Sequence, residues 1–238
     1  MSSFTLAWHF LIFGVLPYVV IAVLILGSLA RFVLAPFSWK SQSSEILDKK
    51  DICWGANLFH IGVIFLFCGH CFGLFTPTEW LNAAGLTPRL HQMMEIICGG
   101  LSAIVAITGL IILTWRRLTN ERVRAASRPS DFWVLFLLLA VIILGIGCVV
   151  NSYLYDKSGA TIILLGGWVR GLFSFDYQAW QNILLVPDWQ KGHIFVGLII
   201  FLIVPFTRLV HIWSGYLSVF YLIRPHQIMR ANNGKPMK

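Results

Sequence analysis

The chain has 238 residues, of which 58% are apolar and 12% are charged, and its formal net charge is +8. Soluble domains carry about 25% charged residues, so this composition excludes an ordinary soluble domain and indicates an integral membrane protein. The positive charge does not indicate nucleic-acid binding, because the basic residues cluster beside apolar segments, as they do at the cytoplasmic flanks of membrane helices. The five cysteines lie in or against apolar segments and predict no disulfide framework.

Five apolar segments predict transmembrane helices, since each is close to the length of about 20 residues that crosses a bilayer. Backbone polar groups in lipid must be hydrogen-bonded within the segment, so these segments are expected to be helical. The expected fold class is all-α, a bundle of five transmembrane helices in one domain that covers residues 1–238. The helices are expected at about 5–30, 54–75, 92–114, 132–151 and 192–213, followed by a tail at 214–238. A further apolar stretch at 160–175 is too short to span and predicts an interfacial helix.

The distribution of basic residues predicts the orientation of the bundle. Fourteen lysines and arginines lie in the loops after the first and third helices, at the end of the fifth helix and in the tail, whereas four lie on the other side. Cytoplasmic loops of membrane proteins carry the excess of Lys and Arg. The N-terminus is therefore expected outside, and the C-terminus and its tail in the cytoplasm.

Four histidines lie at membrane depth, two in the second predicted helix and two in the fifth: His60, His70, His193 and His211. An ionisable residue at this depth is costly and indicates a function. The two helices run in opposite directions, so His70 should pair with His193 at the outer level and His60 with His211 at the inner level. Each pair supplies the two axial imidazoles that haem iron needs, whereas zinc or copper would need a further ligand. Since the motif C-x-x-C-H is absent, the pattern predicts two b-type haems.

Two further residues are candidates for haem binding. Gly69 gives a flat ligand room beside His70, although the seven-residue recurrence of glycines along this helix favours a helix-packing face. Arg208 lies one turn before His211 and either pairs with a haem propionate or anchors the helix at the membrane surface. Pro205 is expected to kink the fifth helix. A different class of protein stays open, a cofactor-free transporter or scaffold in which the histidines bridge neighbouring helices.

Four segments carry a resemblance to a known family: SSEILDKK, ANLFHIGVIFLFCGHCFGLFTP, RRLTNERVR and VPFTRLVHIW. Together with the His-x9-His and His-x17-His spacings, they resemble the gamma, or cytochrome b, subunit of respiratory nitrate reductase. The resemblance implies a five-helix bundle with two b haems, multi-pass in the bacterial or archaeal cytoplasmic membrane, that oxidises quinol near the outer haem. It further implies that electrons pass through the inner haem to an iron–sulfur subunit, which works with a molybdenum catalytic subunit on the cytoplasmic side. The alternative within this class is a related di-haem anchor of a nitrite oxidoreductase or a sulfur-metabolising complex.

One position departs from the pattern of this family. The family has a lysine implicated in quinol binding before the third helix, and matching the glycine pair at Gly99-Gly100 places His91 there. A histidine can accept a proton near neutral pH. Glu95 lies four residues further on the same helical face, where it is expected to relay a proton or to pair at the interface. His91 and Glu95 are therefore the candidate residues of a quinol site, and the plain alternative for His91 is an interfacial polar residue.

Overall fold

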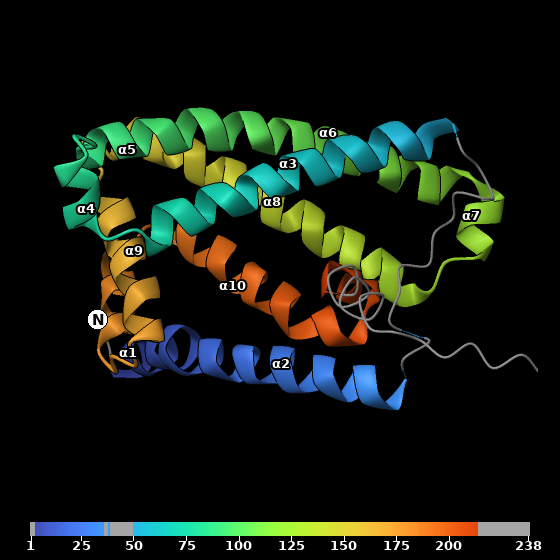
Figure 1. Ribbon diagram of the computed structural model, residues 1–238, viewed down its shortest axis with the longest axis horizontal. Helices are drawn as coiled ribbons and strands as arrows, with labels where there is room; N and C mark the ends of the chain where they lie inside the picture. Colours follow the sequence, from blue (N-terminus) through green and yellow to red (C-terminus); the bar gives the residue numbers. More distant parts are fainter. Residues whose placement is uncertain (1–2, 36–37, 39–49, 214–238) are drawn as a thin grey trace, which may run out of the picture.

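A computed structural model describes residues 3–35, 38 and 50–213, and Figure 1 shows their arrangement. No β-strand occurs in this part of the chain. Part of the evidence for the orientation, Lys40, Lys49 and the predicted tail at 214–238, lies outside the described residues.

Five helical segments are long and apolar enough to cross a membrane, which confirms the predicted fold class. The first contains α1 (Ser3–Phe10), the π-helical turn η1 (Leu11–Val15) and α2 (Leu16–Leu34). The second is α3 (Lys50–Phe75), and the third contains α5 (Pro88–Met94), the π-helical turn η3 (Glu95–Gly99) and α6 (Gly100–Thr119). The fourth is α8 (Pro129–Tyr155), and the fifth contains α10 (Asp188–Ile203) and the 3-10 turn η5 (Val204–Phe206).

Shorter elements lie at the two ends of the bundle. They are α4 (Thr78–Ala83), α7 (Glu121–Ala125), α9 (Ala160–Phe173) and the 3-10 turns η4 (Ala179–Leu185) and η6 (Arg208–Val210). In Figure 1 the long helices run along the long axis, with α4 and α9 at one end and α7 at the other. The stretch predicted as a short helix is α9, which packs on α3 and η4. The side chain of Trp168 ties α9 to the first helix, because its Nε1 donates a hydrogen bond of 2.8 Å to the carbonyl oxygen of Phe13.

Glycine lets α3 and α6 pack backbone against backbone. A Cβ atom at Gly62 of α3 would lie 2.5 Å from the backbone nitrogen of Ala106, and one at Gly109 of α6 would collide with the backbone of Phe59. Small residues are what allows membrane helices to approach this closely. Gly69 differs, because a Cβ atom there would meet nothing within 4 Å. The packing face predicted from the glycine spacing therefore includes Gly62 but not Gly69.

The fifth helix departs from its predicted bounds. Its α-helical part begins at Asp188 and ends at Ile203, so the prediction of one helix at 192–213 was wrong in its second half. Pro205 has no N–H and cannot continue the helix. The chain instead makes the turns η5 and η6 before His211. The interruption lies where the sequence predicted a kink.

Candidate functional site

The four histidines at membrane depth meet in two pairs. The ring centroids of His70 on α3 and His193 on α10 are 6.0 Å apart. Those of His60 on α3 and His211, directly after η6, are 6.2 Å apart. The structure thus brings together the residues that antiparallel matching of the two helices paired. Close backbone packing joins α3 to α6 and α9, and α10 to α8 and α2. In each pair, the ring from α3 lies near the ring from α10 or the segment after it.

Each of the four imidazoles is oriented by a hydrogen bond from Nδ1 to a main-chain carbonyl oxygen. The bonds run from His60 to Ala56 (2.7 Å), from His70 to Leu66 (2.6 Å), from His193 to Val141 (2.9 Å) and from His211 to Arg208 (2.7 Å). A carbonyl oxygen only accepts, so the proton sits on Nδ1 and the lone pair on Nε2. This is how carbonyl groups orient histidines that bind metals. A metal requires the neutral form of the imidazole, with this lone pair free to bind.

Small residues make room beside the His70–His193 pair. A Cβ atom at Gly145 of α8 would lie 3.1 Å from Cε1 of His193, so this glycine lets the ring rest against α8. Gly69 next to His70 borders open space. Gly69 is therefore not a helix contact in this structure, and its role beside a haem stays a prediction.

Arg208 forms an ion pair that neither sequence interpretation included. Its Nη1 lies 3.8 Å from Oδ1 of Asp131 at the start of α8, and Oδ2 of the same carboxylate accepts a hydrogen bond of 2.9 Å from Arg117. Arg208 also supplies the carbonyl oxygen that orients His211. The sequence alone did not indicate this role for Asp131, because its two partners lie on other elements, Arg117 on α6 and Arg208 on η6.

His91 and Glu95, the two candidates for a quinol site, converge on α3. The side chain of His91 is buried, and its Nε2 has no hydrogen-bond partner among the described residues. Oε1 of Glu95 lies 3.9 Å from this nitrogen, too far for a hydrogen bond. A Cβ atom at Gly73 would collide with Oε1 of Glu95 and lie 3.4 Å from Nε2 of His91. Gly73 comes one helical turn after His70, so the two candidates lie next to the helix turn that carries this ligand candidate.

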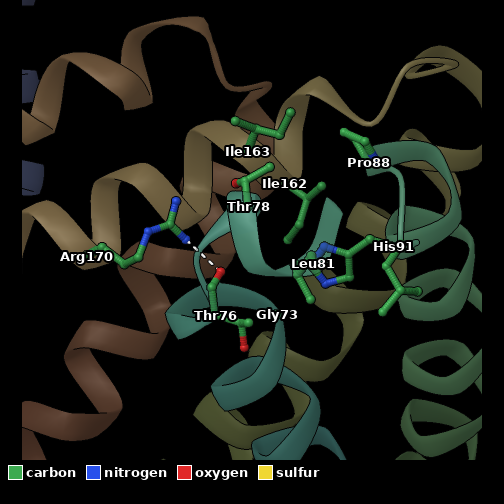
Figure 2. A pocket seen from close by; sticks show the side chains of 10 residues that line it. Gly73, Thr76, Thr78, Leu81, Pro88, His91, Ile162, Ile163 and Arg170 are labelled. Atoms are coloured by element: carbon green, nitrogen blue, oxygen red, sulfur yellow. Dashed lines mark hydrogen bonds between the residues drawn. The ribbon is translucent and has the colours of Figure 1, made fainter. Parts of the chain in front are cut away.

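Figure 2 shows a small pocket at this place, into which His91 and Arg170 point from opposite sides. Arg170 of α9 donates hydrogen bonds to the carbonyl oxygens of Leu74 and Thr76 at the end of α3, at 3.2 and 3.1 Å. The side chain of Thr78 also lines the pocket. Sequence reasoning missed Arg170 as a site residue. Its signal was present, because an arginine inside an apolar helix is costly unless it has a specific partner.

A polar network fixes the helix that carries His91. Gln92 is buried, and its Nε2 donates to the hydroxyl of Ser152 and to the carbonyl oxygen of Asp156, both at 2.8 Å. Arg89 donates to Oε1 of Gln92 at 2.7 Å. The carboxylate of Asp156 in turn accepts from the backbone N–H groups that open α9, including that of Thr161 at 2.9 Å. The network therefore holds α5, α8 and α9, and with them the walls of the pocket, in fixed positions.

Comparison with known proteins identifies the family. The model of the nitrate reductase gamma subunit family matches residues 9–232. The chain belongs to this family. It is 36% identical to the respiratory nitrate reductase 2 gamma chain of Escherichia coli (strain K12) over 92% of its length and 95% of that protein. It is 35% identical to the nitrate reductase gamma chain of Bacillus subtilis (strain 168) over 94% of its length and 98% of that protein.

A third relative is similar to this chain over about a third of its own length. The nitrate reductase-like protein NarX of Mycobacterium tuberculosis (strain CDC 1551 / Oshkosh) is 28% identical over 93% of this chain, which corresponds to 34% of that protein. Family membership and the five apolar helices confirm the predicted multi-pass protein of a bacterial membrane and the predicted resemblance. A gamma subunit of nitrate reductase belongs to a multi-subunit oxidoreductase, and membership implies a b-type haem.

Proposed function

We propose that this gamma subunit holds two b haems, oxidises quinol at the His70–His193 level and passes the electrons to an iron–sulfur partner at the His60–His211 level. The observation that carries the proposal is the geometry of the two histidine pairs. With a metal–imidazole bond of about 2 Å and about 1 Å more from the nitrogen to the ring centre, two imidazoles that held one metal ion between them would have ring centres about 6 Å apart. The observed separations of 6.0 and 6.2 Å fit this value. When bound, the haems supply one-electron transfer chemistry.

The hydrogen bonds of the imidazoles favour haem ligation over a cofactor-free bundle. In a bundle held by bridging histidines, the ring nitrogens should bond to neighbouring helices. Nδ1 of His60, His70 and His211 instead bonds to the carbonyl of a residue three or four positions earlier in its own segment, and only His193 reaches another helix through Nδ1. Nε2 is thus the ring nitrogen that would bind a metal.

The distribution of arginines supports a cytoplasmic location for the His60–His211 pair. Five arginines lie between the end of α6 and the start of α8, at the α7 end of the bundle: Arg116, Arg117, Arg122, Arg124 and Arg128. The positive-inside rule places this end in the cytoplasm. The iron–sulfur subunit and the molybdenum catalytic subunit are accordingly proposed to dock there, which leaves the α9 end outside.

The buried polar atoms at the α9 end suit a proton-coupled reaction. Oxidation of quinol releases two protons with two electrons, so the site needs a proton acceptor, and a neutral imidazole can serve as one. Nε2 of His91 is buried and has no hydrogen-bond partner among the described residues, so a quinol hydroxyl that reached it would supply the missing bond. Oε1 of Glu95 lies 3.9 Å from this nitrogen, so its carboxylate would accept the proton from His91. The guanidinium of Arg170 fixes the opposite wall of the pocket.

The test is the substitution His91→Ala, measured in membranes that contain the whole complex. Quinol-driven reduction of the haems should fall at least about tenfold, a loss of roughly 1.4 kcal/mol of transition-state stabilisation. Nitrate reduction driven by an artificial donor to the soluble subunits should be unchanged. His9→Ala is the matched control, because His9 lies on α1 and its Nδ1 bonds to Thr5 of the same helix.

Two results would count against this function. Unchanged quinol-driven reduction in His91→Ala would remove His91 from the reaction and leave it an interfacial residue. A reduced-minus-oxidised spectrum of the purified wild-type complex that accounts for fewer than two b haems in this subunit would remove the di-haem assignment.

A further inference from the structure

A single arginine of α2 holds the interrupted segment of the fifth helix. Nη1 of Arg31 donates hydrogen bonds to the carbonyl oxygens of Pro205 and Thr207, both at 2.7 Å. Gly27, one turn earlier on α2, allows the close approach, because a Cβ atom there would lie 3.0 Å from Cβ of Pro205. The guanidinium therefore lies directly against the turn between η5 and η6.

The interruption needs such a donor. Where Pro205 breaks the helix, carbonyl groups lose the backbone N–H partners that a continuous helix would supply. In a membrane no water replaces these partners, so each carbonyl left unsatisfied is costly. Hydrogen bonds from a charged donor are roughly twice as strong as neutral ones. Arg31 thus satisfies two carbonyls of the broken segment and fixes its conformation.

The segment that Arg31 fixes carries the hydrogen bond that orients His211. Residue 208 follows Thr207 directly, and its carbonyl oxygen accepts from Nδ1 of His211 at 2.7 Å. The hydroxyl of Thr207 opens η6 by accepting from the backbone of Leu209 at 3.4 Å. We propose that Arg31 is a positioning residue, which sets the orientation of the His211 ring and so the binding of the haem at the His60–His211 level. This inference rests on the proposed di-haem function.

The effect should be confined to one level. The two ligand candidates of the other level lie within continuous helices, His70 in α3 and His193 in α10. Their orienting carbonyls, those of Leu66 and Val141, also belong to regular helices. The hydrogen bonds of Arg31 to Pro205 and Thr207 involve neither of these helices. A loss at the His60–His211 level alone is therefore the signature of a positioning role, and a loss at both levels is the signature of general misfolding.

The experiment compares Arg31→Gln, Arg31→Lys and the control Arg122→Gln in the purified complex. Arg122 is exposed at the same end of the molecule, so its substitution makes the same chemical change away from the break. The measurements are haem content, the midpoint potential of each haem and the low-spin electron paramagnetic resonance signal of each haem. Arg31→Gln should weaken retention of the His60–His211 haem about tenfold, as the loss of an outer-sphere hydrogen bond does at metal sites, and should shift its resonance signal. Arg31→Lys keeps one cationic donor and should restore part of both.

Each remaining outcome has a defined meaning. Wild-type haem content, potentials and resonance signals in Arg31→Gln would overturn the inference. Equal loss of both haems in Arg31→Gln would overturn it too, because Arg31 would then support the whole fold. A wild-type complex with fewer than two b haems in this subunit would overturn the proposed function and this inference with it, whereas two b haems with an insensitive Arg31→Gln would overturn the inference alone.

Discussion

The two histidine pairs have nearly equal ring separations but different backbone support. His70 and His193 come from continuous α-helices, and their rings are nearly parallel, at 18°. His211 follows an interrupted helix, and its ring makes an angle of 75° with that of His60. The first pair lies on regular helices. In the second pair, charged side chains tie the broken segment that carries His211 to other helices. The comparison teaches that equal ligand spacing can rest on regular geometry at one level and on long-range ties at the other.

The two levels also differ in the polar groups around them. Near His70 the buried Nε2 of His91 lies beside the carboxyl group of Glu95, a combination suited to moving protons. Near His211 the carboxylate of Asp131 lies between Arg117 and Arg208, a combination of fixed charges. This difference fits the proposed division, in which proton release accompanies quinol oxidation at the first level and electrons alone leave at the second.

The largest expected effect separates the two levels completely. In the proposed function, replacing His70 or His193 by alanine removes one of the two imidazoles that would hold the haem at that level and should abolish its binding. Replacing His60 or His211 should abolish the other haem. The haem content of the purified complex should fall by one haem in each variant, and a redox titration should lose one of its two transitions.

Each variant serves as the control for the variants of the other level. The idea of two separate sites is wrong if every single substitution removes both haems from a protein that still assembles with its partners. In that case the two pairs would act as one cooperative unit rather than as separate sites.

The sequence predicted the regular level better than the interrupted one. Helical periodicity and the antiparallel order of two helices were enough to pair all four histidines. The hydrogen bonds that hold the interrupted segment could not be predicted, because Arg31 and Pro205 are 174 positions apart. In the sequence, Arg31 is only a charged residue near a membrane boundary. The bond from Arg170 to Leu74 spans 96 positions, and it too depends on how α9 folds back on α3.

The next effect is smaller and should reach both levels equally. Gly62 lies between His60 and His70 on α3, where a Cβ atom would be 2.5 Å from the backbone of Ala106. Gly62→Ala should push α3 and α6 apart and lower the stability of the complex by about 1–3 kcal/mol, the usual cost of overpacking. Thermal unfolding followed by haem absorbance should show both haems lost at a lower temperature.

Gly100→Ala is the matched control for this substitution. A Cβ atom at Gly100 would make only an ordinary contact, 3.8 Å from Val149, so alanine should be neutral or slightly stabilising. Loss of only one haem in Gly62→Ala would show that the two halves of α3 respond separately to the substitution. The two levels would then differ in stability as well as in backbone support.

The smallest expected effect depends on pH and concerns the α9 end alone. Although partial burial opposes its charge, hydrogen bonds from Thr161, Gly159 and Ser158 hold the pKa of Asp156 well below its usual range. A carboxylate with a depressed pKa stabilises the fold above its unfolded pKa, about 3.9, and loses that contribution as the pH falls through the folded pKa. Asp156→Asn should therefore lower the unfolding temperature at pH 7, by an effect of about 1 kcal/mol or less, as for other helix-capping groups.

The difference between wild type and Asp156→Asn should shrink as the pH is lowered below about 4, because both proteins then approach the same uncharged state at this position. Asp188→Asn is the control, since the side chain of Asp188 is 98% exposed and its ion pair with Lys191, at 3.4 Å, lies at the surface. This substitution should leave the unfolding temperature unchanged. A difference that stays constant from pH 7 into the acid range would mean that shape rather than charge makes Asp156 important. The α9 end would then be held by neutral hydrogen bonds, and electrostatic ties would belong to the His60–His211 level alone.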